Sequence, residues 1–214
     1  MSKRSCCSDR IERELWAAGY KLVAGVDEAG RGALAGPVVA AAVILNPEGI
    51  PQGIDDSKKL SRKRRERLFD QIRSSAMAIS VAMVSAAEID RMNIHAASLK
   101  AMSEAIERLS LVPDYVLVDG FVLNTCGVPH RAIIRGDALS VSIAAASIIA
   151  KVTRDRLLAE YDDKWPGYGF AEHAGYSTLR HRLAILNLGI TPVHRTSFRP
   201  VVSGRQKSFD FDEQ

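Results

Sequence analysis

Residues 21–32 read KLVAGVDEAGRG, an apolar run that ends in two acids and a glycine-rich segment. The Val- and Ala-rich beginning of this stretch predicts a β-strand, and residues 38–45 form a second run of the same kind. Three glycines and a proline stand near or between the two runs. We therefore expect two strands joined by a tight turn.

Asp27 and Glu28 stand where the first of these strands reaches the glycines. Neighbouring side chains on a regular strand point to opposite faces of the sheet, so an undistorted strand cannot direct both acids into one site. We predict that the strand ends or bulges between Asp27 and Gly30, where a flexible glycine permits the distortion.

Working outward, helical and strand patterns alternate along the chain. Asp9 and Glu12 predict a capping box for a short helix over residues 9–18, and Asn93 can cap a later helix. Further helices are expected over residues 61–73, from after Asp137 to about Tyr161, and over 177–188, with strands over 76–84, 115–118 and 131–134. This alternation predicts an α/β protein with a mixed central β-sheet flanked by α-helices.

Composition narrows the class of protein. Of the 214 residues, 47% are hydrophobic and 25% are charged, as in ordinary soluble domains, and the net charge of +4 suits a polyanionic partner. The apolar runs are too short to cross a bilayer and the N-terminus lacks the apolar stretch of a secretory signal, so we expect a cytoplasmic protein without a membrane partner. Cys6, Cys7 and Cys126 indicate neither a disulfide framework nor a zinc site.

Four acids follow or close apolar runs, namely Asp27, Glu28, Asp119 and Asp137. A carboxylate beside a core must be hydrogen-bonded, paired or bound to metal, because desolvation is costly. Any one of these acids alone is better explained as a cap or turn residue. A set of four oxygen donors favours Mg²⁺ or Mn²⁺, and two such ions about 4 Å apart suit phosphoryl chemistry.

The glycine segment resembles two nucleotide-binding motifs but fits neither. Arg31 and Gly32 replace the Lys-Ser/Thr that a P-loop requires, and the chain continues after Pro37 as a strand where a dinucleotide fingerprint needs a helix. A Gly-Arg-Gly turn can instead bring bare backbone close to a sugar-phosphate while Arg31 donates to phosphate. The plainer alternative is an ordinary turn with a solvated arginine.

Together these segments resemble the ribonuclease HII family. The similarity covers roughly residues 24–200 and rests on five blocks in a specific order. The blocks are DEAGRG at residues 27–32, DDSKKLS at 55–61, VDG at 118–120, the stretch from Gly136 to Asp155, and GYST at 175–178. The family's block around the fourth acid usually begins Lys-Gly-Asp, where this chain has Arg135 before Gly136 and Asp137.

The resemblance implies a ribonuclease H-like fold with a C-terminal helical region. We expect a catalytic domain over residues 21–202, preceded by an N-terminal helical extension over 1–20 that the capping pattern indicates and followed by a flexible tail over 203–214 that its polar sequence indicates. Only about twenty residues precede the domain, which favours ribonuclease HII over the related HIII class. Asp27, Glu28, Asp119 and Asp137 would be both the catalytic residues and the ligands of Mn²⁺ or Mg²⁺.

The implied activity is hydrolysis of the RNA strand of RNA–DNA hybrids and incision 5′ to ribonucleotides embedded in duplex DNA. The products would carry a 3′-hydroxyl and a 5′-phosphate, and the role would be ribonucleotide removal from DNA. Gly30, Arg31 and Gly32 would sense the 2′-hydroxyl, while Tyr176 would stack on the adjoining deoxyribose and Lys58 would bind phosphate. Backbone groups and an aromatic ring are suitable readers of that hydroxyl.

Basic residues are densest between Lys58 and Arg67, where they can contact phosphates or simply form a solvated helix face. His95, His130, His173, His181 and His194 lack metal-ligand spacing, so we expect capping or surface roles for them. The tail at residues 206–211 faintly resembles a sliding-clamp-binding peptide. We expect a monomer.

Two other functions remain open from the sequence. A non-catalytic basic module would bind nucleic acid without forming metal-dependent products. Another carboxylate-cluster nuclease of the same fold would also cut duplexes made only of DNA.

Overall fold

The computed structural model describes residues 7–123, 127–199 and 201. The chain divides into two compact units. The sheet unit comprises residues 1–29, 39–82 and 99–152, and the helical unit comprises residues 30–38, 83–98 and 153–214.

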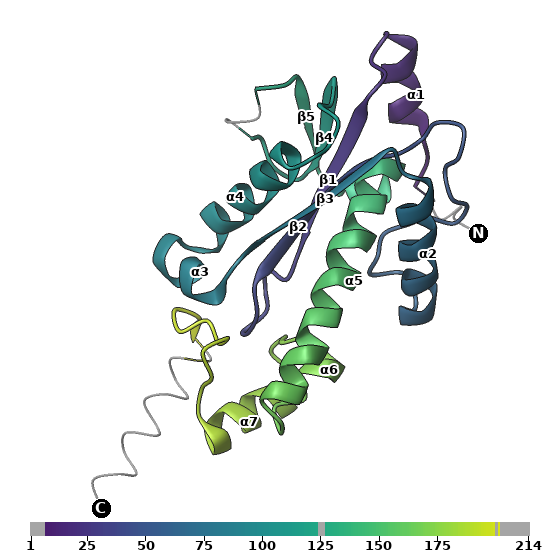
Figure 1. The fold of residues 1–214 in the computed structure, drawn as a ribbon. Helices are drawn as coiled ribbons and strands as arrows, with labels where there is room; N and C mark the ends of the chain where they lie inside the picture. The colour runs from purple at the N-terminus through teal and green to yellow at the C-terminus, as the bar shows by residue number, and fades with distance from the viewer. Residues whose placement is uncertain (1–6, 124–126, 200, 202–214) are drawn as a thin grey trace, which may run out of the picture. The chain divides into compact units, whose positions relative to one another are not determined.

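A five-stranded mixed sheet organises the sheet unit (Figure 1). The strand order is β3-β2-β1-β4-β5; β1 and β2 are antiparallel, whereas β1 with β4 and β4 with β5 are parallel. The strands are β1 (Val23–Ala29), β2 (Val38–Ile44), β3 (Ala78–Val84), β4 (Tyr115–Asp119) and β5 (His130–Ile133). The predicted α/β class with a mixed central sheet is confirmed.

Seven α-helices and one 3₁₀ turn lie within the described residues. They are α1 (Arg10–Ala17), α2 (Arg62–Ser75), α3 (Ala86–Met92), α4 (Ile94–Glu107), η1 (Gly136–Ala138), α5 (Val141–Lys164), α6 (Phe170–His173) and α7 (Leu179–Leu188). Ser61 caps α2, and Asn93 Oδ1 accepts the first amides of α4. None of the described helices has the length and apolar character needed to cross a membrane.

The predicted capping box of α1 is wrong. The Asp9 side chain makes no cap hydrogen bond and instead pairs with Arg13 one turn later. Glu12 is fully buried, where it accepts hydrogen bonds from the Ser140 hydroxyl and from the Ser142 amide. The Glu12 carboxylate, which local spacing assigned to the helix cap, thus bonds to distant residues instead. These bonds connect α1 to the beginning of α5.

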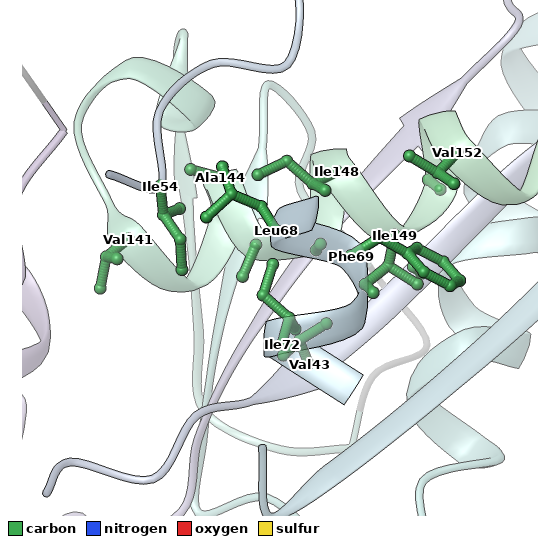
Figure 2. Close-up of a cluster of buried hydrophobic side chains, with 14 of the residues drawn as sticks. Val43, Ile54, Leu68, Phe69, Ile72, Val141, Ala144, Ile148, Ile149 and Val152 are labelled. Carbon is green, nitrogen blue, oxygen red and sulfur yellow. The ribbon is translucent and has the colours of Figure 1, made fainter. Parts of the chain in front are cut away.

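Helices α2 and α5 bury the main apolar cluster of the sheet unit against β2 (Figure 2). Leu68, Phe69 and Ile72 of α2 meet Ile148 and Ile149 of α5 in this cluster. Every residue of β2 is buried, which explains its uninterrupted apolar sequence.

A glycine sets how closely α5 approaches the sheet. A Cβ on Gly25 of β1 would lie 2.1 Å from the carbonyl carbon of Ser142, in the first turn of α5. Only glycine admits this backbone contact. The contact fixes the beginning of α5, and with it the preceding turn, against the strand that carries Asp27.

Strand β1 runs without a break through both of its acids. Glu28 pairs with Ala40 and Ala29 with Val39 in a regular antiparallel register, and the strand ends at Ala29, so the predicted end between Asp27 and Gly30 is confirmed and the alternative, a bulge, is wrong. The predicted tight turn is also wrong, because residues 30–37 form the whole connection to β2. Most of this connection belongs to the helical unit, where buried side chains hold it.

Candidate active site

Three of the four predicted acids meet at one point of the sheet unit. Asp27 lies on β1, Asp119 ends β4 and Asp137 lies in η1. One carboxylate oxygen from each lies within 4.8 Å of the others. The parallel register pairs Val26 with Val118, so the acid that follows each valine lies beside the other on neighbouring strands.

Asp137 reaches this cluster through a turn that the sequence did not predict in detail. Arg135 adopts a left-handed conformation with φ of 56°, after which η1 begins. The Gly136 amide donates to Asp119 Oδ1 at 2.6 Å, and a Cβ on Gly136 would lie 2.5 Å from Ile143 Cδ1. The turn therefore packs tightly against α5 and is bonded directly to the neighbouring acid.

The electrostatics of the cluster require a positive partner. Burial raises the pKa of Asp27 well above its usual value, and the negative charges of Glu28 and Asp119 raise it further. Burial also raises the pKa of Asp119, although the hydrogen bond from Gly136 opposes this shift. Clustered carboxylate oxygens without nitrogen or sulfur donors fit a hard divalent cation. Asp27, Asp119 and Asp137 would hold it.

Lys58 supplies a cation to the cluster. Its Nζ lies 3.1 Å from Asp137 Oδ2, while 78% of its side chain is exposed. Burial would lower the pKa of Lys58, but the hydrogen bond and the negative charge of Asp137 outweigh it and raise the pKa. Asp56 Oδ1 accepts the Lys58 amide at 2.9 Å, which orders the turn that presents this lysine.

Glu28 is placed differently from the three clustered acids. It follows Asp27 on the continuous strand, and adjacent side chains of a strand point to opposite faces. Its negative charge still raises the pKa of Asp27. Its part in catalysis and metal binding stays a prediction.

Two buried arginines fix the glycine segment of the helical unit. Arg195 donates to the carbonyls of Gly30, Arg31 and Gly36 at 2.7 to 3.0 Å. Arg154 donates to three further carbonyls, those of Pro37, Ala174 and Ala35, at 2.8 to 2.9 Å. Because these carbonyls are bonded inward, the segment has a defined backbone geometry.

Gly30 is the position where this packing demands glycine. Its φ is +95°, and a Cβ there would lie 2.0 Å from Arg154 Nε. Both arginine side chains are fully buried. Burial and the nearby Arg154 charge lower the pKa of Arg195 to about 9.

Tyr176 lies against the same segment. It forms an isolated antiparallel bridge with Ala33, and the preceding Gly175 carbonyl accepts the Leu34 amide at 2.8 Å. The Arg154 guanidinium carbon lies 5.5 Å from the centre of the Tyr176 ring. The helical unit therefore brings the predicted Gly-Arg-Gly segment and the predicted tyrosine together.

The basic segment lines a surface groove of the sheet unit. The groove has a volume of about 870 Å³ and is lined by Gln52, Gly53, Ser61, Lys63, Arg64, Arg67, Leu68 and Gln71. Arg65 differs from its neighbours, because its guanidinium donates inward to the carbonyls of Ser57 and Leu60. Only part of the predicted basic stretch thus lines the groove.

The residue-by-residue interpretation missed several groups. Arg154 and Arg195 were not singled out; a basic residue inside the long helix is a signal for Arg154, whereas Arg195 lies in a loop and gives no such signal. The expected surface or capping roles are wrong for His181 and His194, which are buried and bonded to each other at 3.1 Å. Cys7 is half-buried and donates to the Ile54 carbonyl, whereas Cys6 and Cys126 lie outside the described residues.

The sheet topology and the carboxylate cluster define a ribonuclease H-type enzyme. The structure is similar to ribonuclease H2 of Pyrococcus horikoshii OT3, with a TM-score of 0.76 and 29% identity over 91% of this chain and all of that one. It is also similar to ribonuclease HII of Archaeoglobus fulgidus, solved in a complex with PCNA, with a TM-score of 0.72 and 32% identity over 83% and 95% of the two chains.

Sequence relatives identify the family more closely. The family model described as Ribonuclease HII matches residues 24–201. Ribonuclease HII of Geobacter sulfurreducens is 58% identical over 86% of this chain and 84% of its own length, and that of Geobacillus kaustophilus is 55% identical over 90% and 74%. The chain belongs to the ribonuclease HII family and is a ribonuclease H, a hydrolase, as the sequence motifs predicted.

Proposed function

We propose that this enzyme incises duplex DNA on the 5′ side of an embedded ribonucleotide, in addition to hydrolysing RNA in RNA–DNA hybrids. The products carry a 3′-hydroxyl and a 5′-phosphate, and the biological role is removal of ribonucleotides from DNA in the cytoplasm. The observation that carries this proposal is the bridge between Tyr176 and the fixed segment that follows Gly30.

The chemical step uses the carboxylate cluster. Asp27, Asp119 and Asp137 would hold divalent ions, Mn²⁺ or Mg²⁺, with Glu28 as the fourth acid of the set. The chemistry that bound ions would supply is activation of a water and stabilisation of the leaving oxygen. Lys58 lies where a phosphate oxygen can replace Asp137 as its partner, so we assign it to substrate binding.

Discrimination uses the helical unit. The inward-bonded carbonyls leave the backbone around Gly30, Arg31 and Gly32 fixed in one conformation, which suits close contact with a ribose. The 2′-hydroxyl is the group that distinguishes ribose there. Tyr176, held on the same segment, stacks on the deoxyribose that follows.

The groove lined by Lys63, Arg64 and Arg67 holds the flanking duplex through its phosphates. A weak contact between the tail and a sliding clamp stays a prediction for this chain, since residues 206–211 lie outside the described residues. The PCNA complex of the Archaeoglobus fulgidus protein gives that prediction a precedent. The expected monomeric state is likewise a proposal.

Labelled duplexes test the proposed function. Strands containing no ribonucleotide, one ribonucleotide or a run of them are incubated with the enzyme and Mg²⁺ or Mn²⁺, and then with chelator. We expect one cut on the 5′ side of a single ribonucleotide, no cut in all-DNA duplex, and no product with chelator. A cut in all-DNA duplex would point to a general nuclease.

Asp119→Asn is the matched variant, because it keeps the side-chain shape but removes the charge from the metal cluster. It should retain duplex binding and lose cleavage. Asp163→Asn, on the exposed end of α5, serves as the control and should cleave normally. Normal cleavage by Asp119→Asn would refute the metal-cluster mechanism.

A further inference from the structure

Two buried histidines of the helical unit form a chain of hydrogen bonds that ends on Tyr176. The Thr191 amide donates to His194 Nδ1 at 2.9 Å. His194 Nε2 lies 3.1 Å from His181 Nε2. His181 Nδ1 lies 3.0 Å from the Tyr176 carbonyl oxygen. The chain thus connects the loop after α7 to the backbone of the residue assigned to sugar stacking.

The donor at one end of the chain and the acceptor at the other determine where each proton lies. A backbone amide can only donate, so His194 Nδ1 must be the unprotonated acceptor and His194 carries its proton on Nε2. That proton is donated to His181 Nε2, which must then be unprotonated. His181 therefore carries its proton on Nδ1 and donates it to the Tyr176 carbonyl, which can only accept. The Thr191 hydroxyl, 2.9 Å from His194 Nδ1, can donate to the same unprotonated nitrogen, so one arrangement of protons satisfies every contact.

Both rings are neutral in this arrangement. A second proton on His181 would set two N–H groups against each other across the 3.1 Å contact between the Nε2 atoms, and a second proton on His194 would set its Nδ1–H against the Thr191 amide. Burial, together with the neighbouring imidazole, lowers the pKa of each histidine to about 4. Since every ring nitrogen already donates or accepts, the pair offers no lone pair to a metal ion.

A third histidine holds the residue before Tyr176. The ring of His173 stacks on His181 with 4.6 Å between the centres. Its Nδ1 accepts the Gly175 amide at 3.2 Å, and its Nε2 lies 2.9 Å from the Tyr168 carbonyl. His173 and His181 therefore bond to two consecutive residues of the segment that carries the tyrosine ring, and His194 bonds to His181.

We propose that His181 and His194 are positioning residues that act through the backbone of Tyr176, and that His173 assists by fixing Gly175. This imidazole relay fixes the direction of the Tyr176 carbonyl and hence the ring that meets the deoxyribose. The functional part rests on the proposed role of Tyr176, whereas the proton arrangement does not.

Nitrogen-15 NMR of the imidazoles tests the arrangement directly. At pH 7 we expect His181 in the Nδ1–H form, His194 in the Nε2–H form, and both neutral when the sample is brought to pH 5.5. The denatured protein serves as the comparison, because histidine in an unfolded chain protonates over this range. The opposite tautomer at either buried ring, or a charged ring at pH 7, would overturn the relay.

Two substitutions of the same histidine separate positioning from simple packing. The amide nitrogen of Asn can take the place of Nδ1, so His181→Asn keeps the donor to Tyr176, whereas His181→Gln reaches toward Nε2 and loses it. We expect kcat/KM on a duplex with one embedded ribonucleotide to fall about tenfold for His181→Gln and to stay near wild type for His181→Asn. Equal losses in the two variants would refute positioning through this donor.

A double-mutant cycle tests whether the effect passes through Tyr176. If it does, His181→Gln should change little in a Tyr176→Ala background, because the two losses are not additive. Additive losses would refute the proposal. If Tyr176→Ala itself leaves single-ribonucleotide cleavage unchanged, the proposed function of Tyr176 is wrong. The proton arrangement of the relay is then still tested by the tautomers that NMR reports.

Discussion

Two regions of this protein bury charge in opposite ways. In the sheet unit, three carboxylates lie within 4.8 Å of one another, and Asp27 is almost fully buried. In the helical unit, Arg154 and Arg195 are fully buried, and their guanidinium groups donate hydrogen bonds to six backbone carbonyls. The first region gathers like charges, whereas the second distributes each charge over internal dipoles.

The charges of the first region need a bound ligand to compensate them, whereas the charges of the second are compensated by the chain itself. Like charges held together in a low-dielectric setting destabilise the fold until a cation or a proton compensates them. Buried guanidiniums whose donors meet carbonyls are already compensated and fix the backbone around them. Charge removal should therefore stabilise the first region and destabilise the second.

The largest effect is expected from Asp27→Asn. Cleavage should fall by roughly a thousandfold or more because a metal ligand is lost. The metal-free variant should nevertheless unfold at a temperature a few degrees higher than wild type, since repulsion with Asp119 and Glu28 is removed. Activity assays and calorimetry with chelator measure the two effects.

Divalent metal sharpens this comparison further. Mg²⁺ or Mn²⁺ should raise the melting temperature of the wild type and should do so much less in Asp27→Asn. Asp163→Asn should behave like wild type in both assays. A lower melting temperature for metal-free Asp27→Asn would contradict the view that this region is strained by its own charge.

The second prediction concerns Arg195→Lys. A lysine keeps the positive charge but cannot reach the carbonyls of Gly30, Arg31 and Gly36 together, so buried acceptors lose their donor. We expect a loss of about 3 kcal/mol in the free energy of unfolding, measured with denaturant. Arg182→Lys on the exposed face of α7 is the control and should cost less than about 0.5 kcal/mol. Equal costs would show that the carbonyl network contributes little.

The third prediction uses pH to compare the two regions. His181 and His194 have a pKa of about 4 in the folded state, against 6.5 when unfolded. Between these values the unfolded chain binds more protons, so their stabilisation is complete above about pH 6.5 and is lost as the pH falls toward 4. Each histidine contributes a slope of up to about 1.4 kcal/mol per pH unit.

The acids act in the other direction, because a raised carboxyl pKa makes the folded state bind more protons. The Asp27→Asn substitution removes one of these opposing groups. Denaturant titrations of this metal-free variant between pH 4.5 and 7 therefore show the contribution of the histidines to the pH dependence of stability more clearly. Adding His194→Asn removes one titrating group and should reduce the slope. An unchanged slope would mean that the pair is already protonated.

The sequence anticipated most of the elements and the acids because both depend on short-range patterns. The apolar run before Asp119 predicts a strand, and Asn93 predicts a helix cap; the structure contains both. Acids at strand ends converge because parallel neighbours end at one edge. Those inferences need no knowledge of distant residues.

The failures share a physical cause, which is competition from distant partners. Glu12 has the spacing of a cap but bonds to Ser140, and the buried histidines pair across loops rather than by ligand spacing. The continuity of β1 also follows from its pairing with β2. Local sequence patterns do not encode such contacts. The hydrogen-bond partners of these residues could therefore not be predicted from the sequence.

The smallest effect is expected from charges that are not buried at all. Lys63, Arg64 and Arg67 line the groove on the exposed side of α2, where water screens them. Replacing all three by Ala should reduce the slope of log affinity against log salt by about 2 to 3, since each phosphate contact contributes about 0.9. Stability should change by less than about 0.5 kcal/mol for each substitution.

Arg65→Ala is the matched control for the groove. Its guanidinium donates to the carbonyls of Ser57 and Leu60, so its loss should lower stability while leaving the salt dependence of duplex binding nearly unchanged. Fluorescence anisotropy with chelator, across a range of salt, separates the two variants. If Arg65→Ala changed the slope as much as the triple variant did, the groove would be a solvated helix face rather than the surface that holds the duplex.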